Sequence, residues 1–332
     1  MSLTDALWLS NSEDERSLHD GLAIAPARPL ETNFLTDDSP TPAAWKPKNF
    51  RSPVFDVGMH DGTDTAFYLH QGHAVLAIEA DPALAEAGAR RFADAVARGQ
   101  LHVLNVGIAE AAGTASFWIC EDHSVWNSFD VQVASRNGSR HHPISISTWR
   151  FGEVIDRFGV PVYLKIDIEG ADALCVRDLR RDALPKFISV ESECVGDGEV
   201  LANESAIRML DLLRDAGYTR FKLVSQCDFT TARYPDRWRF VRSVIDSVAF
   251  GKLSRLGVGG LAKPLTAWER LRKRNDGYQF ECGGSGPWAD GLLGRWSSYA
   301  DARNIYLQLR DQFFSRPDVK PYAFWYDWHA SY

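Results

Sequence analysis

The chain has 332 residues, of which 45% are hydrophobic and 24% charged, so it is a folded globular protein and neither a disordered chain nor a fibrous repeat. Its formal net charge of −7 argues against a nucleic-acid-binding protein, which needs clustered lysine and arginine. The five cysteines form no CxxC pair, and neither a signal segment nor a membrane-spanning apolar run is present, so we expect a cytoplasmic protein with no zinc, nucleic-acid or membrane partner.

Residues 1–50 are rich in proline, serine and aspartate, which predicts an N-terminal arm without long helices. From residue 51 to 228, short apolar runs alternate with helical stretches, the pattern of βαβ units. We therefore predict an α/β core with a doubly wound, mostly parallel sheet. The expected strands are 53–57, 74–78, 101–106, 160–166, 187–190 and 220–224, the expected helices are 63–70, 83–97, 171–179 and 203–216, and 113–119 is expected to leave the sheet as a strand or hairpin.

The first predicted strand ends in a turn with the sequence DVGMHDG, residues 56–62. Gly58 and Gly62 have no Cβ and let the backbone approach a bound nucleotide closely. A dinucleotide fingerprint, G-x-G-x-x-G, would have glycine in place of His60 and would hold a pyrophosphate. A carboxylate at Asp56 is better suited to the cationic sulfonium and ammonium groups of a methyl donor than to two phosphates.

Glu79 ends the second predicted strand. An acidic residue at this point can accept hydrogen bonds from both ribose hydroxyls of an adenosine ligand. Because NAD and methyl donors both contain adenosine, Glu79 alone does not separate them. The following residues, Asp81 and Pro82, are typical of a helix N-cap and first turn.

The fourth predicted strand ends in charged residues, in the sequence YLKIDIEGAD at 163–172. Strand alternation places Leu164 and Ile166 on one face and Lys165 on the other, together with Asp167 and Glu169 just beyond. Charged groups beside a buried strand need partners or a cavity. The alternative to a catalytic role is a structural network of lysine and carboxylates.

These segments, DVGMHDG, AIEADP, LNVGIAE, YLKIDIEGAD and ISVESE, occur in an order and spacing that resembles the FkbM family of S-adenosylmethionine-dependent methyltransferases. The resemblance covers about residues 53–225, and the stretch KIDIEGAD is its most specific element. The chain departs from the family pattern at His60, where asparagine is common, and at Trp149 and Arg150, where Leu-Asp is common.

The resemblance implies a class I methyltransferase fold, Rossmann-like, with a seven-stranded sheet whose last strand is antiparallel. It also implies S-adenosylmethionine as the cofactor and O-methylation of a sugar, glycan or small natural product. By position, the donor's amino-acid end would lie against Asp56, Gly58, His60 and Gly62, its ribose against Glu79, and its adenine beside Asn105, Val106 and Gly107.

Methyl transfer to an alcohol requires alignment of the two substrates and a base for the hydroxyl proton. Asp167 is the first candidate for this base, supported by Glu169 and Lys165, and Glu191 and Glu193 are the next candidates. A divalent metal held by Asp167, Glu191 and Glu193 is an alternative that we do not expect.

Residues 229–332 form an aromatic-rich C-terminal extension. We expect it to supply the final sheet strand and, from about 229 to 297, part of a lid over the acceptor. Aromatic faces can stack on sugars, which favours a saccharide or small-molecule acceptor, although the rings can instead form a second small core. The sequence is also compatible with a homo-oligomer. The tryptophans concerned are Trp238, Trp268, Trp288, Trp296, Trp325 and Trp328.

Two other functions compete with methyl transfer. An NAD-dependent oxidoreductase would need the glycine that His60 replaces, and titration with the two ligands decides between them. A non-catalytic glycan-binding protein would use the aromatic C-terminal third and would not require Asp56, Glu79 and Asp167. Failure to bind any adenosine ligand would favour this third function.

Overall fold

The computed structural model describes residues 47, 49–192, 205–233, 267–281, 283–314 and 325–332. The chain divides into two compact units, Met1–Phe34 and Leu35–Tyr332, and all described residues belong to the second. Nearly all of the predicted N-terminal arm lies outside the described residues.

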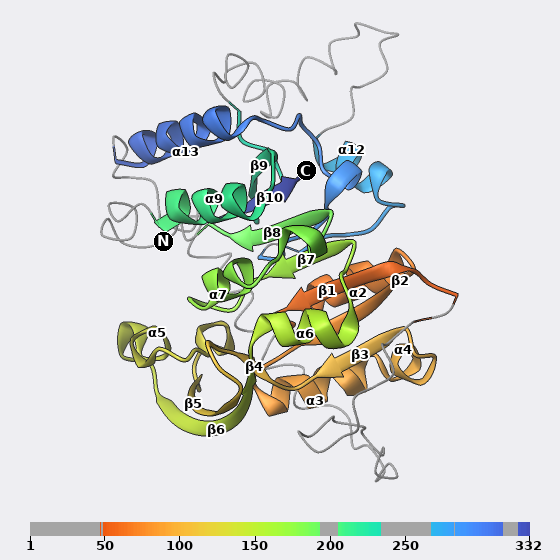
Figure 1. Cartoon of the computed structure of the whole chain (residues 1–332), viewed down its shortest axis with the longest axis vertical. Helices are drawn as coiled ribbons and strands as arrows, with labels where there is room; N and C mark the ends of the chain where they lie inside the picture. Colours follow the sequence, from red (N-terminus) through yellow and green to blue (C-terminus); the bar gives the residue numbers. More distant parts are fainter. Residues whose placement is uncertain (1–46, 48, 193–204, 234–266, 282, 315–324) are drawn as a thin grey trace, which may run out of the picture. The chain divides into compact units, whose positions relative to one another are not determined.

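Seven strands form one sheet in the order β3-β2-β1-β7-β8-β10-β9 (Figure 1). Neighbouring strands from β3 to β8 are parallel, and β10 runs antiparallel between β8 and β9. A parallel sheet with one antiparallel strand beside its edge is the predicted class I methyltransferase topology, which is confirmed. The strands are β1 (Arg51–Val57), β2 (His73–Ile78), β3 (Leu101–Leu104), β7 (Tyr163–Ile166), β8 (Phe187–Glu191), β9 (Arg220–Ser225) and β10 (Tyr326–Ser331).

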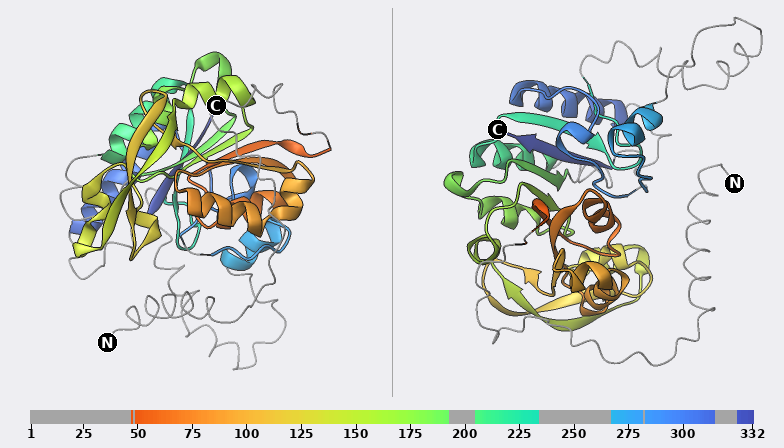
Figure 2. Two further views of the ribbon diagram at one scale, coloured as in Figure 1. Left: turned by 90° about the horizontal axis from the view of Figure 1, so that it is seen from below. Right: turned by 90° about the vertical axis from the view of Figure 1, so that its right-hand side faces the viewer.

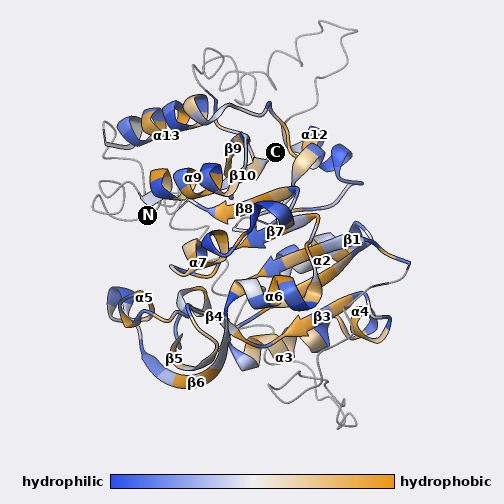
Figure 3. Cartoon of the chain, in the orientation of Figure 1, coloured by the Kyte–Doolittle hydropathy of each residue, from blue (hydrophilic) through white to orange (hydrophobic). Residues whose placement is uncertain are grey.

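Helices cover both faces of this sheet (Figure 2). The first face packs against α6 (Phe151–Phe158), α7 (Asp172–Arg177), α9 (Ser205–Ala216) and α13 (Tyr299–Phe314). The second face packs against α2 (Thr63–His70), α3 (Pro82–Arg91), α4 (Ala93–Ala97) and α12 (Ala267–Arg274). Blue and orange alternate along α9 and α13 in Figure 3, as expected for helices that bury one side.

Local sequence signals explain where several helices begin and end. The side chain of Asp81 accepts a hydrogen bond from the N–H of Ala83, and Pro82 occupies the first turn of α3, as predicted. The predicted helix 83–97 is wrong in one respect, because Phe92 has non-helical angles (φ −110°, ψ 31°) and separates α3 from α4.

A smaller sheet leaves the main one after β3, in the order β4-β6-β5. It contains β4 (Gly107–Ile108), β5 (Gly113–Cys120) and β6 (His141–Trp149). Between β5 and β6 lie the short helices η1 (Ser124–Trp126), α5 (Val131–Ala134) and η2 (Arg136–Gly138). The predicted departure of 113–119 from the main sheet is confirmed, whereas β6 and α6 were not predicted. We call residues 121–140 the insertion.

The C-terminal extension supplies β10, so a final sheet strand does come from this part of the chain. Its described aromatic rings are used for packing. Trp288 stacks on Tyr163 and Trp268 on Phe229 in the core of the second face. Trp328 is fully buried in the core of the first. The middle of the predicted lid, residues 234–266 with Trp238, lies outside the described residues. No described helix is both long and apolar enough to cross a membrane.

The two faces of the sheet differ in polarity. Leu164 and Ile166 of β7 point to the first face, where the core cluster is apolar, and Lys165 points to the second, as predicted. Strand alternation places further polar residues on the second face, in register across five strands: Asp56, Lys165, Ser189, His329 and Lys222.

Candidate active site

The glycine turn after β1 lies directly against the end of β7. Gly58 has φ +85°, and a Cβ at this position would lie 1.8 Å from the backbone oxygen of Asp167. The N–H of Asp167 donates to the carbonyl of Val57 at 2.9 Å. Only glycine fits this left-handed, crowded position, so the sequence forces the turn and the first charged residue beyond β7 together.

The rest of the turn leads into α2. Gly62 has φ +84°, and a Cβ there would meet the ring of Phe92 at 2.6 Å. The Asp61 carboxylate accepts hydrogen bonds from the N–H and hydroxyl of Thr63 at 2.9 and 3.1 Å. These bonds and the neighbouring His60 hold the pKa of Asp61 well below its usual value, although burial acts in the opposite direction. The turn is therefore held by its own side chains.

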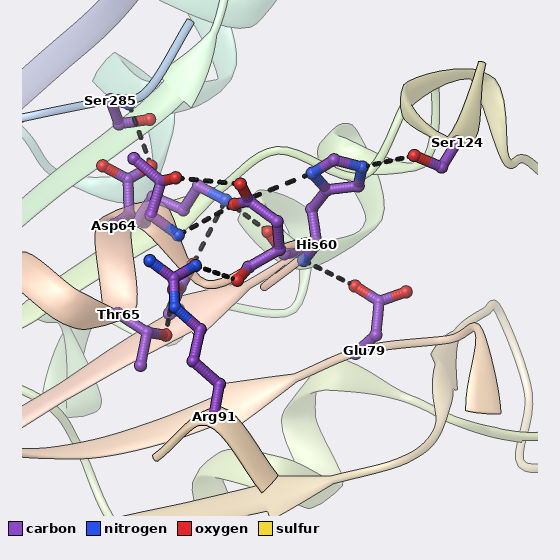
Figure 4. Close-up of polar contacts among 12 residues, drawn as sticks. His60, Asp64, Thr65, Glu79, Arg91, Ser124 and Ser285 are labelled. Carbon is purple, nitrogen blue, oxygen red and sulfur yellow. Dashed lines mark hydrogen bonds and ion pairs between the residues drawn. The ribbon is translucent and has the colours of Figure 1, made fainter. Parts of the chain in front are cut away.

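Glu79, 6% exposed, joins this turn to the end of β2 (Figure 4). Its Oε2 accepts from the N–H of His60 at 2.7 Å and its Oε1 from the N–H of Asp81 at 2.9 Å. Burial raises the pKa of Glu79 and the two N–H groups oppose that rise. A carboxylate has about four acceptor positions, so both oxygens retain capacity for ligand hydroxyls.

The residues expected beside the adenine follow β3. The Asn105 amide donates to the carbonyls of Glu79 and Ala80 at 2.7 and 3.2 Å, which fixes the chain after β2. Val106 is buried in the core of the first face. Gly107 begins β4, where a Cβ would meet the ring of Phe129 at 2.5 Å. Of these three residues, Asn105 lies nearest to the glycine turn through its contact with Glu79.

The insertion is tied to the same edge of the sheet. His60 Nε2 and the Ser124 hydroxyl lie 2.8 Å apart (Figure 4). The Asn127 amide donates to Asp81 at 3.0 Å, and the Ser128 hydroxyl donates to the carbonyl of Glu169 at 3.0 Å. Three separate strand ends thus share hydrogen bonds with the insertion, a contact that the sequence did not reveal.

Asp56 and Lys165 form a buried ion pair beneath the turn. Lys165 Nζ lies 3.1 Å from Asp56 Oδ1, and the Thr65 hydroxyl donates to Oδ2 at 2.6 Å. Burial alone would lower the pKa of Lys165, but the carboxylates of Asp56 and Asp167, with that of Asp64, raise it above its usual value. Lys165 therefore carries a positive charge, which compensates the negative charge of its ion-pair partner Asp56.

Asp64, in the first turn of α2, binds the C-terminal extension. Its carboxylate accepts from the N–H groups of Ser285 and Gly286 at 3.0 and 2.9 Å (Figure 4). Burial raises the pKa of Asp64 to about 6, assisted by the Asp56 charge and opposed by Lys165 and the two N–H groups. The Gly-Gly-Ser-Gly loop at 283–286 is therefore fastened beside the glycine turn.

Further carboxylates follow the neighbouring strands. Glu191 ends β8 directly opposite Asp327 of β10. Burial, then the charges of Glu169 and Asp167 among others, raises the pKa of Glu191 well above its usual value. Burial and the Asp167 charge also raise the pKa of Asp327 to about 7, although Gln226 donates to Asp327 Oδ1 at 2.7 Å. Glu169 forms an ion pair with Arg136 of the insertion, with 3.5 Å between Glu169 Oε2 and Arg136 Nη1.

The predicted site residues thus gather at the carboxyl ends of β1, β2, β7 and β8, where ligands bind in doubly wound sheets. Glu193 lies outside the described residues. The sequence analysis missed Asp64, Ser124, Ser285 and Asp327. Only Asp327 had a usable local signal, because polar and apolar residues alternate in the sequence YDWHAS of β10.

Within the described ranges, no group of three or more histidine, cysteine, aspartate or glutamate side chains has the arrangement of a metal site. Cys120, Cys175 and Cys227 are free thiols. The carboxyl groups of Asp167, Glu191 and Asp327 act on one another, and that of Asp167 also acts on Lys165.

Residues 56–220 match the family model of the methyltransferase FkbM domain. No curated protein sequence resembles the chain closely enough to count as a match. Two solved structures are similar to it: a TehB-like SAM-dependent methyltransferase from Corynebacterium glutamicum ATCC 13032 Kitasato (10% identity, TM-score 0.26, 52% of this chain and 68% of that one) and phosphoethanolamine N-methyltransferase 2 from Haemonchus contortus in complex with S-adenosyl-L-methionine (8% identity, TM-score 0.32, 86% of this chain and 50% of that one). The chain spans half the length of the Haemonchus enzyme.

Proposed function

We propose that this chain, which belongs to the FkbM methyltransferase family, transfers a methyl group from S-adenosylmethionine to a hydroxyl of a sugar, glycan or small natural product. One observation carries the proposal: Gly58 brings the glycine turn, with Glu79 behind it, into contact with Asp167. A turn suited to an adenosine ligand and a residue whose carboxylate is suited to proton transfer therefore lie side by side at the carboxyl ends of β1 and β7. A cytoplasmic location stays a prediction.

The residues at these strand ends fit the methyl donor. Glu79 offers acceptor capacity to a ribose, and Gly58 and Gly62 add no side chains of their own to the turn. The carboxylates of Asp167, Glu169 and Glu191 favour a ligand with a sulfonium and an ammonium group. When bound, the donor supplies a methyl group already activated for displacement.

Asp167 is the proposed base. Its side chain is partly exposed, and no hydrogen bond to its carboxylate is found within the described ranges. Lys165 lies near enough for the two charges to interact, yet it donates its hydrogen bonds to Asp56 and to the carbonyl of Gly58. Asp167 is therefore available to accept an alcohol proton, and Glu191 is the neighbouring group to which the proton can pass.

A hydroxyl-rich acceptor finds hydrogen-bonding groups beside these carboxylates. Asp327 Oδ2 and Ser285 Oγ are buried and approach one another, but neither atom meets hydrogen-bond geometry with any described residue. Buried polar atoms are normally hydrogen-bonded, so their free positions suit acceptor hydroxyls. We propose that the loop at 283–286 forms part of the acceptor-site lid, while the rings of Trp268 and Trp288 serve the core.

Calorimetry with S-adenosylhomocysteine tests the donor site. We expect binding by the wild type and a loss of about 1–3 kcal/mol in Glu79→Ala, because charge-assisted hydrogen bonds are removed. Glu86→Ala, at an exposed glutamate of α3, is the matched control and should bind normally. NAD is titrated in parallel. Binding of NAD in place of S-adenosylhomocysteine would favour an oxidoreductase, and binding of neither would favour the glycan-binding protein.

A further inference from the structure

Lys222, in the middle of β9, is a buried cation outside the proposed active site. Its side chain points to the second face of the sheet, and the residue is only 2% exposed. Its ammonium group lies 4.6 Å from the centre of the Trp296 ring. Among the described residues, Lys222 forms no ion pair with a carboxylate, and the nearest carboxylate that acts on its charge is that of Asp290.

His329 lies on the same face of the sheet, on the neighbouring strand β10. It is the register partner of Lys222, is 1% exposed, and its Nε2 has no hydrogen-bond partner. Burial, and then the Lys222 charge, lowers the pKa of His329 to about 3. The imidazole is therefore neutral and adds no charge of its own, but its unpartnered ring nitrogen can donate a hydrogen bond in one tautomer.

The other charges around Lys222 are mainly positive. Burial, with the charges of Arg274 and Arg233, lowers the pKa of Lys222 to about 8, and Asp290 opposes them. Both arginines and Asp290 are exposed. A fourth basic residue, Arg220, also lies over the Trp296 ring, with its guanidinium carbon 5.8 Å from the ring centre. This local excess of positive charge contrasts with the net charge of −7 of the whole chain.

Burial removes part of the hydration of the Lys222 ammonium, as its lowered pKa shows, and a cation–π contact returns only about 0.5–2 kcal/mol. An anion at this point would restore the missing partner of both Lys222 and His329. We propose that Lys222 and His329, with Arg233 and Arg274 at the surface, form a binding site for a small oxyanion group, a phosphate or a carboxylate. The site does not depend on the methyl donor or on Asp167.

The oxyanion can be a free ion or a substituent of a larger molecule, and two probes distinguish these sources. Inorganic phosphate represents the free ion, and glucose 6-phosphate represents a sugar that carries the same group. Equal affinities would assign the site to free phosphate. An affinity for glucose 6-phosphate at least about tenfold higher would assign it to an anionic substituent, because additional contacts must then be present.

Calorimetry on the full chain at constant ionic strength, adjusted with chloride, tests the site. Lys222→Met should weaken the binding of the better probe by about tenfold or more, the usual effect of losing a buried charge-assisted hydrogen bond. Lys186→Met is the matched control, because Lys186 also lies over a ring, that of Phe187 at 5.4 Å, but is exposed. Its affinity should stay within about twofold of the wild type.

Thermal unfolding separates loss of the site from loss of the fold. Without phosphate, Lys222→Met should unfold at a higher temperature than the wild type, because it removes an unpaired buried charge. Added phosphate should raise the unfolding temperature of the wild type and of Lys186→Met, but not that of Lys222→Met. Absence of phosphate binding by the wild type, or equal binding by Lys222→Met, would overturn the proposal.

Discussion

The residues proposed to hold the methyl donor and the polar residues of β10 and its neighbours differ in how their polar groups are paired. In the half built from β3, β2 and β1, Glu79, Asp61 and Asn105 all have hydrogen-bond partners inside the protein. In the half built from β8, β10 and β9, several buried polar groups have no hydrogen-bond partner among the described residues. These are Asp327 Oδ2, Ser285 Oγ and His329 Nε2.

This difference separates donor-site residues whose polar groups are paired without a ligand, Glu79, Asp61 and Asn105, from residues of β10 and the 283–286 loop whose polar groups are not. The donor half is held by short hydrogen bonds within the turn and to the insertion, so its shape exists before a ligand binds. In the other half, unpaired buried groups and carboxylates with raised pKa values lower the stability of the free protein. A ligand that binds there gains from relieving that destabilisation.

We expect the largest effect from a substitution in the glycine turn, Gly58→Ala. In Gly58→Ala the new Cβ would lie 1.8 Å from the backbone oxygen of Asp167, at φ +85°. We expect the free energy of unfolding to fall by about 3–5 kcal/mol, because strand ends must separate, and S-adenosylhomocysteine binding to be lost. Urea unfolding and calorimetry measure the two effects.

Gly72→Ala is the matched control for this change. Gly72 has a similar φ of +78°, but a Cβ there would meet no atom within 4 Å. Its substitution should lower the free energy of unfolding by only about 1–2 kcal/mol, the strain of a left-handed residue, with normal binding. Equal effects of the two substitutions would show that the contact with Asp167 is unimportant.

The second prediction concerns Asp167, which follows β7, the strand between β1 and β8. Asp167→Asn keeps the side-chain shape and removes the proton acceptor, so turnover of an accepted hydroxyl substrate should fall by about 100-fold or more. Binding of S-adenosylhomocysteine should change little, and Asp182→Asn, at an exposed carboxylate, should behave as the wild type. Loss of wild-type activity with chelator and its return with Mg²⁺ or Mn²⁺ would instead support the metal alternative.

The third prediction uses the raised pKa of Asp327. Its folded value of about 7 lies above the usual 3.8, so between these values the folded protein holds a proton that the unfolded chain releases. The wild type therefore loses stability as pH rises through this window. Asp327→Asn should be more stable than the wild type by about 2 kcal/mol at pH 8, and the difference should shrink toward pH 4.

Urea unfolding of both proteins at pH 4, 6 and 8 gives this difference directly. Because the Asp327 charge itself raises the pKa of Glu191, the difference between wild type and variant also includes the relief of that repulsion, which adds to the stability of the variant at high pH. A pH-independent difference would mean that Asp327 is already ionised in the folded protein, and the contrast between the two halves would then rest on the unpaired atoms alone.

Sequence by itself determined the elements whose signals are local. The bounds of α2 and the capping of α3 by Asp81 follow from neighbouring residues, and the alternation around Lys165 follows from strand geometry. Two elements were not predicted because their local signals are weak. Strand β6 is mostly exposed and contains Pro143, and helix α13 has no clear apolar pattern. Local patterns also placed Glu79 and Asp167 at strand ends, where parallel strands bring them to one edge.

Tertiary structure alone decided the contacts that complete the site. Ser285 reaches Asp64, Ser124 reaches His60, and β10 enters the sheet between β8 and β9. These contacts put Asp327 opposite Glu191 and His329 beside Lys222. Residues so far apart in sequence meet only because the whole chain buries its apolar surface in one arrangement, and no local periodicity encodes which distant polar groups are then enclosed together.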